Sequence, residues 1–419
     1  MLVNEEAFQA LKGLRILDIA TLFAAPGVAS ILSDFGAEVI KVDHPKGDDI
    51  RRMGWQKDGY SLWSLLVSRN KRSITLNLSK KSGQEILKKL IVDTDILIEN
   101  FRTGTLEKWN LSPAVLHEIN PGLIILRTTG FGQTGPYATQ AGFGTAAEAM
   151  SGFAFINGYP DGPPTLPPSA LADAVAGLTG TYAVMIALYW RDMNGGTGQV
   201  VDLSLFEPLF SILGIMAPVY DQLGIIQERV GNALPFAAPR NTYQAKDGVW
   251  LAVSGTSQSV AERIMEIIGR QEISEEPWFK DQPGRLAHAA ELDAAISAWI
   301  KEHDAQHVVE AFKAGNAVVA PIYSIADCFV DPQFIARNAI IDVKHPVLGN
   351  VKVPSPVPHF DKTPGHIEHL GVDLGKHNEE VLIGELGLTR AEYEEATKVD
   401  EAGSQNRSAN EKNADGSIS

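Results

Sequence analysis

Short apolar runs alternate with longer amphipathic stretches through the first part of the chain. Runs at 14–19, 37–42, 73–78, 96–98 and 123–129 have the length and composition of buried strands, and helical patterns lie between most of them. Repeated alternation of strand and helix is typical of a parallel sheet covered by helices. The pattern therefore predicts an α/β domain, whose ligands would bind at the carboxyl ends of the strands.

The pattern changes near residue 225. A loop rich in Ala, Pro and Asn occupies 230–241, the pair Asp247-Gly248 favours a hairpin turn, and helical patterns then dominate. We predict a large domain at 1–224 and a smaller α+β domain at 225–330. The residues at 398–419 are polar, with few large apolar side chains, and predict a disordered tail.

Charge and cysteine content narrow the class of protein. The 419 residues include 36 basic and 51 acidic side chains, a net charge of -15, which disfavours nucleic acid as a partner. The single cysteine, Cys328, allows no disulfide within the chain and favours a cytoplasmic location. The N-terminal residues lack an apolar signal core, and no apolar run approaches ~18 residues without a charge or a turn residue. We therefore expect no membrane span.

Asp173 is the sharpest candidate for chemistry. It follows a proline-rich segment at 163–168 and begins a nearly charge-free helical stretch at 174–182. A carboxylate at the head of a helix meets the positive end of the helix dipole and free backbone N–H groups, which favour its ionised, nucleophilic form. A plain helix cap has the same pattern, so both interpretations stay open on these residues alone.

Two further motifs carry weaker signals. Gly130 to Gly135 match GxGxxG after a strand, but Pro136 follows directly, so a tight glycine turn competes with a nicotinamide-nucleotide site. Cations at Lys71, Arg72, Lys80, Arg102 and Lys108 either hold phosphates or form ordinary surface charge. No cluster of cysteine and histidine has the spacing of a metal site, and we predict none.

The order of several motifs is similar to that of family III coenzyme A transferases, the CaiB/BaiF type. The resemblance covers about residues 11–390, and Asp173 falls where the family carries its nucleophile. The segments that carry it are 17–42, Asn70 to Leu78, Glu99 to Gly104, Gly130 to Tyr137, Gly198 to Leu205 and Tyr243 to Gly248.

The resemblance implies more about architecture than the periodicity does. It implies a ring-shaped subunit with a Rossmann-like large domain, a smaller domain at 225–330, and a linker at 331–397 that returns to the large domain. Two such rings would interlock into a homodimer, with the active site between the two chains. A heteromer stays open as an alternative.

The resemblance also implies a reaction. CoA would pass from an acyl-CoA donor, commonly succinyl-CoA, to a carboxylic acid through a mixed anhydride and an aspartyl-CoA thioester on Asp173. The CoA thioester is a substrate, and no metal or redox cofactor is implied. The side chains expected to bind CoA, by position and by charge, are Leu22, Phe23, Ala24, His44, Lys71, Arg72, Leu76, Lys80, Asn100, Phe101, Arg102, Lys108, Gly130 and Phe131.

Two other enzyme classes are alternatives. An α-methylacyl-CoA racemase of the same superfamily would need a second base. The racemases share a histidine in this role, shortly after the Gly-Pro turn. Phe143 stands in that stretch here and cannot move a proton. A nicotinamide-dependent oxidoreductase would use the glycine motif instead, and NAD binding would distinguish it. Leu22 and Phe23 replace more polar residues of oxalate-type members, which disfavours formyl-CoA and oxalate as substrates.

Overall fold

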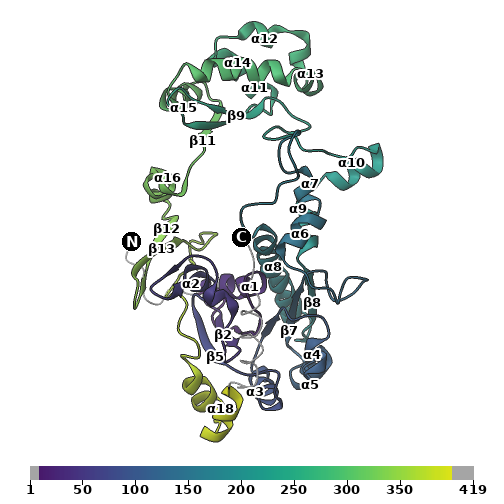
Figure 1. Ribbon diagram of the computed structural model, residues 1–419, viewed down its shortest axis with the longest axis vertical. Helices are drawn as coiled ribbons and strands as arrows, with labels where there is room; N and C mark the ends of the chain where they lie inside the picture. Colours follow the sequence, from purple (N-terminus) through teal and green to yellow (C-terminus); the bar gives the residue numbers. More distant parts are fainter. Residues whose placement is uncertain (1–8, 399–419) are drawn as a thin grey trace, which may run out of the picture. The chain divides into compact units, whose positions relative to one another are not determined.

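Six parallel strands form the central sheet of the computed structural model, which describes residues 9–398 (Figure 1). The strand order is β5-β2-β1-β6-β7-β8, which is the Rossmann order 3-2-1-4-5-6 when the six strands are numbered along the chain. The predicted α/β class with a parallel sheet is therefore confirmed. The strands are β1 (Arg15–Asp18), β2 (Glu38–Asp43), β5 (Lys71–Thr75), β6 (Ile96–Glu99), β7 (Ile124–Thr129) and β8 (Val200–Ser204).

The chain divides into two compact units. Among the described residues, unit 1 comprises 9–151, 168–212 and 338–398, and unit 2 comprises 152–167 and 213–337. Unit 2 thus begins before the predicted residue 225 and also takes residues 152–167. Contacts explain the second difference, because the Gly231 N–H donates to the Gly158 carbonyl at 2.9 Å. The predicted tail at 398–419 lies, from residue 399 on, outside the described residues.

Helices cover both faces of the sheet in unit 1. Ile16 packs with α1 and α8 on one face, whereas its neighbour Leu17 packs with α3, α5 and α18 on the other, as the alternation of strand side chains requires. The helices of unit 1 are α1 (Ala24–Asp34), a 3-10 turn (Asp49–Arg52), α2 (Leu62–Val67), α3 (Lys81–Ile91), α4 (Thr105–Lys108), α5 (Pro113–Ile119), α6 (Gly144–Met150), α8 (Leu171–Met193), α9 (Phe206–Ile212), a π-helix (Glu379–Glu385) and α18 (Arg390–Thr397).

Residues after 338 pack on unit 1 and complete its sheet. The hairpin β12 (Ile340–His345) and β13 (Gly349–Pro354) shares a small core with Leu65, and a further short hairpin joins β3 (Gln56–Lys57) to β4 (Tyr60–Ser61). Strand β5 lies at the edge of the sheet. The Ser73 N–H donates to His377 Nδ1 at 3.0 Å, and the Thr75 N–H donates to Asn378 Oδ1 at 2.8 Å. Burial lowers the pKa of His377, which suits a neutral ring that accepts at Nδ1. Side chains thus replace a partner strand at this edge.

Unit 2 is an α+β unit. Its antiparallel sheet has the order β11-β10-β9, and β9 and β10 form the hairpin that the Asp247-Gly248 turn predicted. The strands are β9 (Arg240–Gln244), β10 (Trp250–Ser254) and β11 (Val318–Pro321). The helices are α7 (Phe153–Ile156), α10 (Met216–Leu223), α11 (Gln258–Ile267), α12 (Gln271–Glu275), a 3-10 turn (Pro277–Lys280), α13 (Gln282–Ala287), α14 (Ala289–Lys301), α15 (Ala305–Ala314), α16 (Ile325–Val330) and α17 (Pro332–Ala336).

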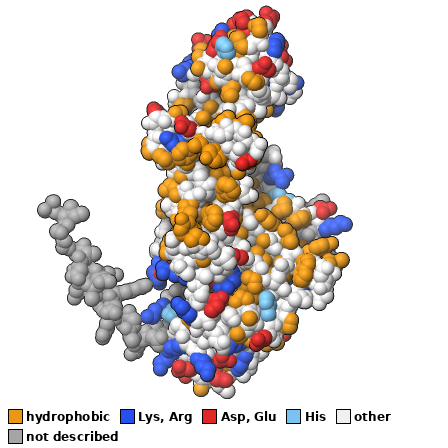
Figure 2. All heavy atoms as spheres, turned by 90° about the vertical axis from the view of Figure 1, so that its right-hand side faces the viewer, with side chains coloured by type: hydrophobic (Ala, Val, Ile, Leu, Met, Phe, Trp, Pro, Cys, Tyr) orange, Lys and Arg blue, Asp and Glu red, His pale blue; other side chains and the backbone are white. Residues whose placement is uncertain are grey.

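Helix α8 carries an exposed apolar stripe. Tyr182, Ile186 and Tyr189 are 58%, 63% and 71% exposed, although the opposite side of the helix packs on α1 and β7. Figure 2 shows many hydrophobic side chains at the surface of one face of the molecule. Among the described helices, α8 alone has the length and composition to cross a membrane, a test that core helices also pass. The absence of a membrane span therefore stays a prediction.

Candidate active site

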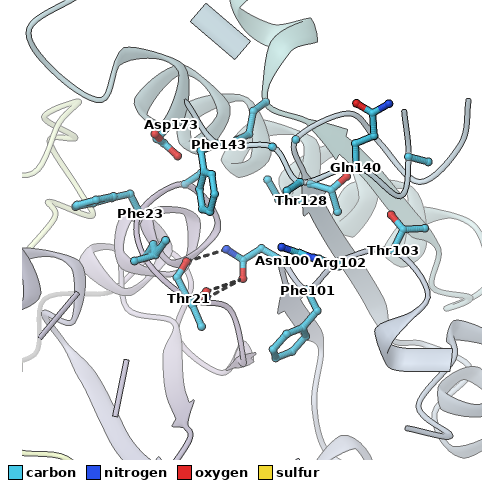
Figure 3. A pocket seen from close by; sticks show the side chains of 18 residues that line it. Thr21, Phe23, Asn100, Phe101, Arg102, Thr103, Thr128, Gln140, Phe143 and Asp173 are labelled. Atoms are coloured by element: carbon cyan, nitrogen blue, oxygen red, sulfur yellow. Dashed lines mark hydrogen bonds between the residues drawn. The ribbon is translucent and has the colours of Figure 1, made fainter. Parts of the chain in front are cut away.

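A cavity lies where the strand order of the sheet reverses. The connections after β1 and β6 run to opposite faces of the sheet, and such a switch point is the usual ligand site of an open α/β sheet. The cavity has a volume of about 140 Å³ (Figure 3). Its walls are Thr21 to Ala24, Asn100 to Thr103, Thr128 to Gly130, Ala138, Gln140 to Phe143, Asp173 and Leu205.

Eight residues predicted from the sequence meet in this cavity. In Figure 3, Asp173 and Phe23 lie on one side of the cavity, with Asn100 and Arg102 near its middle. The structure therefore gathers side chains from four separate segments of the chain. The eight are Leu22, Phe23, Ala24, Asn100, Phe101, Arg102, Gly130 and Asp173.

Asn100 joins the two walls of the cavity. Its Oδ1 accepts from the Thr21 N–H at 2.8 Å, and its Nδ2 donates to the Thr21 carbonyl at 2.7 Å (dashed in Figure 3). Asn100 follows β6 and Thr21 follows β1, so this pair of hydrogen bonds fixes the two connections at the switch point. The sequence predicted that the Asn100 amide contacts CoA. In the structure the amide binds the Thr21 backbone and so fixes the cavity wall, and its contact with CoA stays a prediction.

Asp173 lies in the first turn of α8 rather than at its cap. The helix begins at Leu171, after Ala170, which makes Asp173 the third helical residue. Its Oδ2 lies so close to Gly144 that a Cβ at that glycine would collide with it. Gly144 is the first residue of α6. The carboxylate is therefore confined between the starts of two helices, at a place where only glycine fits.

The pKa of Asp173 is raised to about 6. Burial is the main cause, and the negative charge of Glu148 adds to it, while the backbone N–H of Asp173 opposes both. The helix-dipole argument had favoured a low pKa, so the direction expected from the sequence was wrong. The apolar surroundings that make the helix recognisable also remove water from the carboxylate, and desolvation outweighs the dipole.

Glu148 is a site residue that the sequence analysis missed. It lies on α6, is only 4% exposed, and accepts from the Ala172 N–H at 3.3 Å. A single carboxylate within the small, apolar sequence of α6 was the signal that could have indicated it. A buried carboxylate with a raised pKa beside a second buried carboxylate, in a cavity, is typical of a functional site, which favours this end of the cavity as the reacting centre.

Three hydroxyl groups in the cavity wall lack partners. The Oγ1 atoms of Thr103, Thr128 and Thr129 are buried and have no hydrogen bond within residues 9–398. Buried polar groups in proteins are nearly always paired. The cavity is therefore suited to a ligand with several polar groups.

A second cavity, of about 180 Å³, adjoins the first, since Thr21 and Phe101 line both. Its walls include the predicted residues His44 and Leu76. Trp109 packs edge-to-face on Phe101 at 5.0 Å between ring centroids, which makes part of the wall aromatic. Lys80 and Lys108 are chain neighbours of the lining residues Ser79 and Trp109.

Five predicted residues line neither cavity, namely Lys80 and Lys108, described above, and Lys71, Arg72 and Phe131. Lys71 is 1% exposed and binds Asp18, so no phosphate can reach it. Arg72 pairs with Glu38, Glu380 and Glu385 at the amino end of β5, away from the carboxyl edge that holds the site. The ring of Phe131 packs against Gly142 and Tyr137 behind the cavity wall. A basic pair before a strand does not show which cation will be buried, which is why the sequence misassigned Lys71 and Arg72.

The glycine motif serves packing and turning. A Cβ at Gly130 would lie 2.6 Å from Gly142 Cα, and Gly132 and Gly135 have φ of 84° and 86°. The next helix begins only at Gly144, so the motif does not open a helix as a dinucleotide site requires. Within residues 9–398 there is also no group of three or more metal-ligating side chains.

Comparison with known proteins identifies the class to which this fold and site belong. The model of CoA-transferase family III matches residues 11–378, so the chain belongs to that family and is a CoA-transferase. A succinyl-CoA–D-citramalate CoA-transferase of Chloroflexus aurantiacus is 40% identical over 90% of this chain and 94% of its own length. The beta subunit of a succinyl-CoA–L-malate CoA-transferase of that bacterium is 42% identical over the same shares. A CaiB/BaiF family protein of Brucella suis has a similar structure, with a TM-score of 0.79 and 32% identity over 90% of this chain and 99% of that one.

Proposed function

We propose that this chain moves CoA from succinyl-CoA to a hydroxy or methyl dicarboxylate through covalent intermediates on Asp173. The observation that carries the mechanism is the place of Asp173, a confined carboxylate in the cavity at the sheet's switch point. The substrates rest on the relatives, which by name act on succinyl-CoA with D-citramalate or L-malate.

The reaction is a series of exchanges between anions. The Asp173 carboxylate attacks the thioester carbonyl of the donor, the C–S bond breaks, and a mixed anhydride and CoA thiolate result. The thiolate attacks the Asp173 carboxyl carbon and expels the donor acid, which leaves an aspartyl-CoA thioester. The acceptor carboxylate then attacks this thioester and releases the thiolate. The thiolate finally attacks the acceptor carbonyl, which yields the new thioester and free Asp173.

No step of this series gains or loses a proton. Every nucleophile is already an anion, so the site needs an ionised carboxylate and no general base. A pKa of about 6 leaves Asp173 mostly ionised at neutral pH, and its burial weakens the hydration that an attacking carboxylate must shed. Phe143, at 65% exposure, stands in the cavity where a racemase of this superfamily would carry a base. These features favour transfer over racemisation.

The two adjoining cavities suggest how CoA lies. A cavity of about 150 Å³ holds a molecule the size of benzene. The first cavity, at about 140 Å³, is therefore suited to the thioester and its neighbouring atoms, with amide groups of the pantetheine arm at the unpartnered threonine hydroxyls. The adenine would lie in the second cavity, near His44 and Leu76, with phosphates toward Lys80 and Lys108.

Mass spectrometry of the trapped intermediate tests the proposal. The protein is incubated with succinyl-CoA and quenched with hydroxylamine or borohydride, and peptides are mapped. A modification confined to Asp173 is expected, and Asp173→Asn should lose it together with CoA transfer to D-citramalate or L-malate. Asp192→Asn, at the exposed end of the same helix, is the matched control and should keep both. Transfer that persists in Asp173→Asn would refute the mechanism.

We also propose that a second copy of the chain covers the apolar stripe of α8. Single exposed apolar residues are common, but a stripe of Tyr182, Ile186 and Tyr189 along one helix is typical of an interface. Light scattering after gel filtration should give the mass of a homodimer, and Ile186→Glu should give a folded monomer. A monomeric wild-type protein would refute the homodimer. That result would favour a heteromer as the functional assembly, since one of the relatives is named as a beta subunit.

A further inference from the structure

The loop between β1 and α1 holds Leu22 in the left-handed conformation. Its φ is 64°, a region that residues with a Cβ rarely adopt because the Cβ crowds the backbone. Such residues persist only where surrounding contacts fix them, and they concentrate at functional sites. Leu22, Phe23 and Ala24 all line the cavity that contains Asp173. The side chains that fix this loop are therefore connected to the reaction.

Side chains outside the loop bind its backbone at the start, at the left-handed turn and at the end. Each anchor uses a hydrogen bond to a main-chain atom, so it sets the path of the chain whatever the loop side chains are. The anchors are Asn100 on both polar groups of Thr21, Lys41 on the Ala20 carbonyl, Asp48 on the Leu22 N–H at 3.0 Å, and Lys71 on the Pro26 carbonyl at 2.7 Å.

Three of these anchors belong to a buried network of charges. Lys71 Nζ lies 2.9 Å from Asp18, and Lys41 Nζ lies 3.3 Å from Asp43. These four side chains and Asp48 are each at most 6% exposed. Buried ion pairs seldom stabilise a protein more than apolar residues of the same size, because desolvation offsets the attraction. Stability alone therefore does not explain why charged side chains occupy this place. Their role as rigid hydrogen-bond donors and acceptors beneath a strained loop does explain it.

Lys71 keeps its proton at neutral pH. Burial lowers the pKa of its ammonium group to about 8, and the neighbouring carboxylate of Asp18 opposes the shift. The charged group can therefore donate to Asp18 and to the Pro26 carbonyl together. Neither bond faces the cavity, so Lys71 acts on the site only through the loop.

The loop and the nucleophile pack against each other. Gly177 lies one turn after Asp173 on α8, and a Cβ at Gly177 would lie 3.4 Å from the Ala24 carbonyl. The start of α1 therefore rests on the turn that follows Asp173. A displacement of the loop moves Phe23 and the first N–H groups of α1 relative to the Asp173 carboxylate.

We propose that Lys71 and Asp48 are positioning residues for the transfer of CoA at Asp173, because they hold residues 20–26, the loop and the first turn of α1, in the conformation that sets Phe23 and Ala24 against the nucleophile. The inference rests on the proposed function. It assigns a role to two residues that would not touch the reacting atoms.

Two variants and one control test the role. Lys71→Met removes the bond to Pro26 and keeps the length of the side chain. Asp48→Ser keeps a hydroxyl to cap the 3-10 turn that Asp48 now caps, but is too short to reach the Leu22 N–H as well. The control is Arg69→Met, which breaks the partly buried ion pair with Asp34 at the other end of α1. All three variants lose buried polar contacts on unit 1, and only the first two release the loop.

The measurements are the rate of Asp173 modification at saturating succinyl-CoA, kcat and KM for transfer, and the midpoint of urea unfolding. For Lys71→Met and Asp48→Ser, we expect the modification rate and kcat to fall by ~10- to 100-fold, as displacements near 1 Å at a reacting centre do. For Lys71→Met, whose side chain lines neither cavity, KM should change by less than about threefold. For Asp48→Ser, whose side chain also lines the second cavity, the modification rate at saturating succinyl-CoA decides. Arg69→Met should unfold at lower urea and keep the wild-type rates.

Wild-type rates in both loop variants would overturn the inference, as would a raised KM with kcat unchanged, or an equal loss of rate in Arg69→Met. If Lys71→Met does not fold, Asp48→Ser decides on the modification rate. A wild-type protein that neither forms the modification nor transfers CoA refutes the proposed function, and the inference falls with it. Wild-type activity with unaffected variants refutes the inference alone.

Discussion

Replacing the nucleophile Asp173 with asparagine should make the folded protein more stable at neutral pH. The pKa of Asp173 rises from 3.8 to about 6 on folding, mainly through burial and secondarily through Glu148. A group whose pKa is raised by folding contributes stability below its unfolded pKa and loses that contribution as the pH rises through its folded pKa. Ionised Asp173 is thus a cost to the fold at pH 7, and a neutral asparagine of the same shape does not carry it.

The size of the gain follows from the shift. A change of about 2 pKa units corresponds to ~3 kcal/mol at most, since one unit is about 1.4 kcal/mol. Partial hydration of the site lowers the expected gain to ~1–3 kcal/mol in the free energy of unfolding at pH 7. The gain should shrink as the pH falls through about 6 and vanish below about 4. Urea unfolding of both proteins at pH 7 and pH 4, followed by tryptophan fluorescence, measures it.

Asp43→Asn is the control of opposite sign. The pKa of Asp43 is lowered, because Lys41 and Arg51 outweigh the effect of burial. Its carboxylate therefore contributes stability at pH 7, and the amide should be less stable there. Equal stability of Asp173→Asn and wild type at pH 7, or the same gain at pH 4, would show that Asp173 is not destabilised in its ionised form.

Three further changes test the same region and the sheet edge. Transfer by the wild type should fall as the pH drops through about 6, with kcat/KM about tenfold lower at pH 5 than at pH 7. Glu148→Gln should move this fall to lower pH, because it removes the charge that raises the pKa of Asp173. An unchanged pH profile would show that Glu148 does not affect that pKa. Gly144→Ala should abolish modification of Asp173, because the added Cβ collides with its Oδ2, while circular dichroism stays that of the wild type; full activity would contradict the confined geometry. Asn378→Ala should lower the free energy of unfolding by ~1–2 kcal/mol, because the Thr75 N–H loses its acceptor; an unchanged urea midpoint would show that another group replaces it.

The alternation of strands and helices was enough to predict the parallel sheet and the edge where the site lies. The sequence predicted eight of the eighteen residues of the cavity wall, and the motif resemblance supplied Phe23, Asn100 and Asp173 among them. These predictions succeed because strand ends and loop motifs are contiguous in the sequence. The carboxyl ends of neighbouring strands must meet in space, whatever the details of packing.

Burial and long-range contacts were not predictable in the same way. Lys71 carries the same charge as a surface lysine, and only the packing of β5 beside β2 and β1 shows that it lies under the loop. The raised pKa of Asp173 depends first on burial and then on the charge of Glu148, which comes 25 residues earlier in the sequence. The division into two units depends on residues 152–167, which join a unit that otherwise begins at residue 213. Each of these facts is set by tertiary packing, which the periodicity of the local sequence does not encode.

The closed edge of the sheet has a consequence for synthesis on the ribosome. The Ser73 N–H has no acceptor until His377 is made, 304 residues later, and the whole of unit 2 is translated in between. At 5–20 residues per second this takes ~15–60 s. Throughout that time β5 exposes unpaired N–H groups, to which a strand of another chain can bind. A nascent chain stalled before His377 would therefore carry an unpaired sheet edge, which is covered only once the segment with His377 and Asn378 has been made.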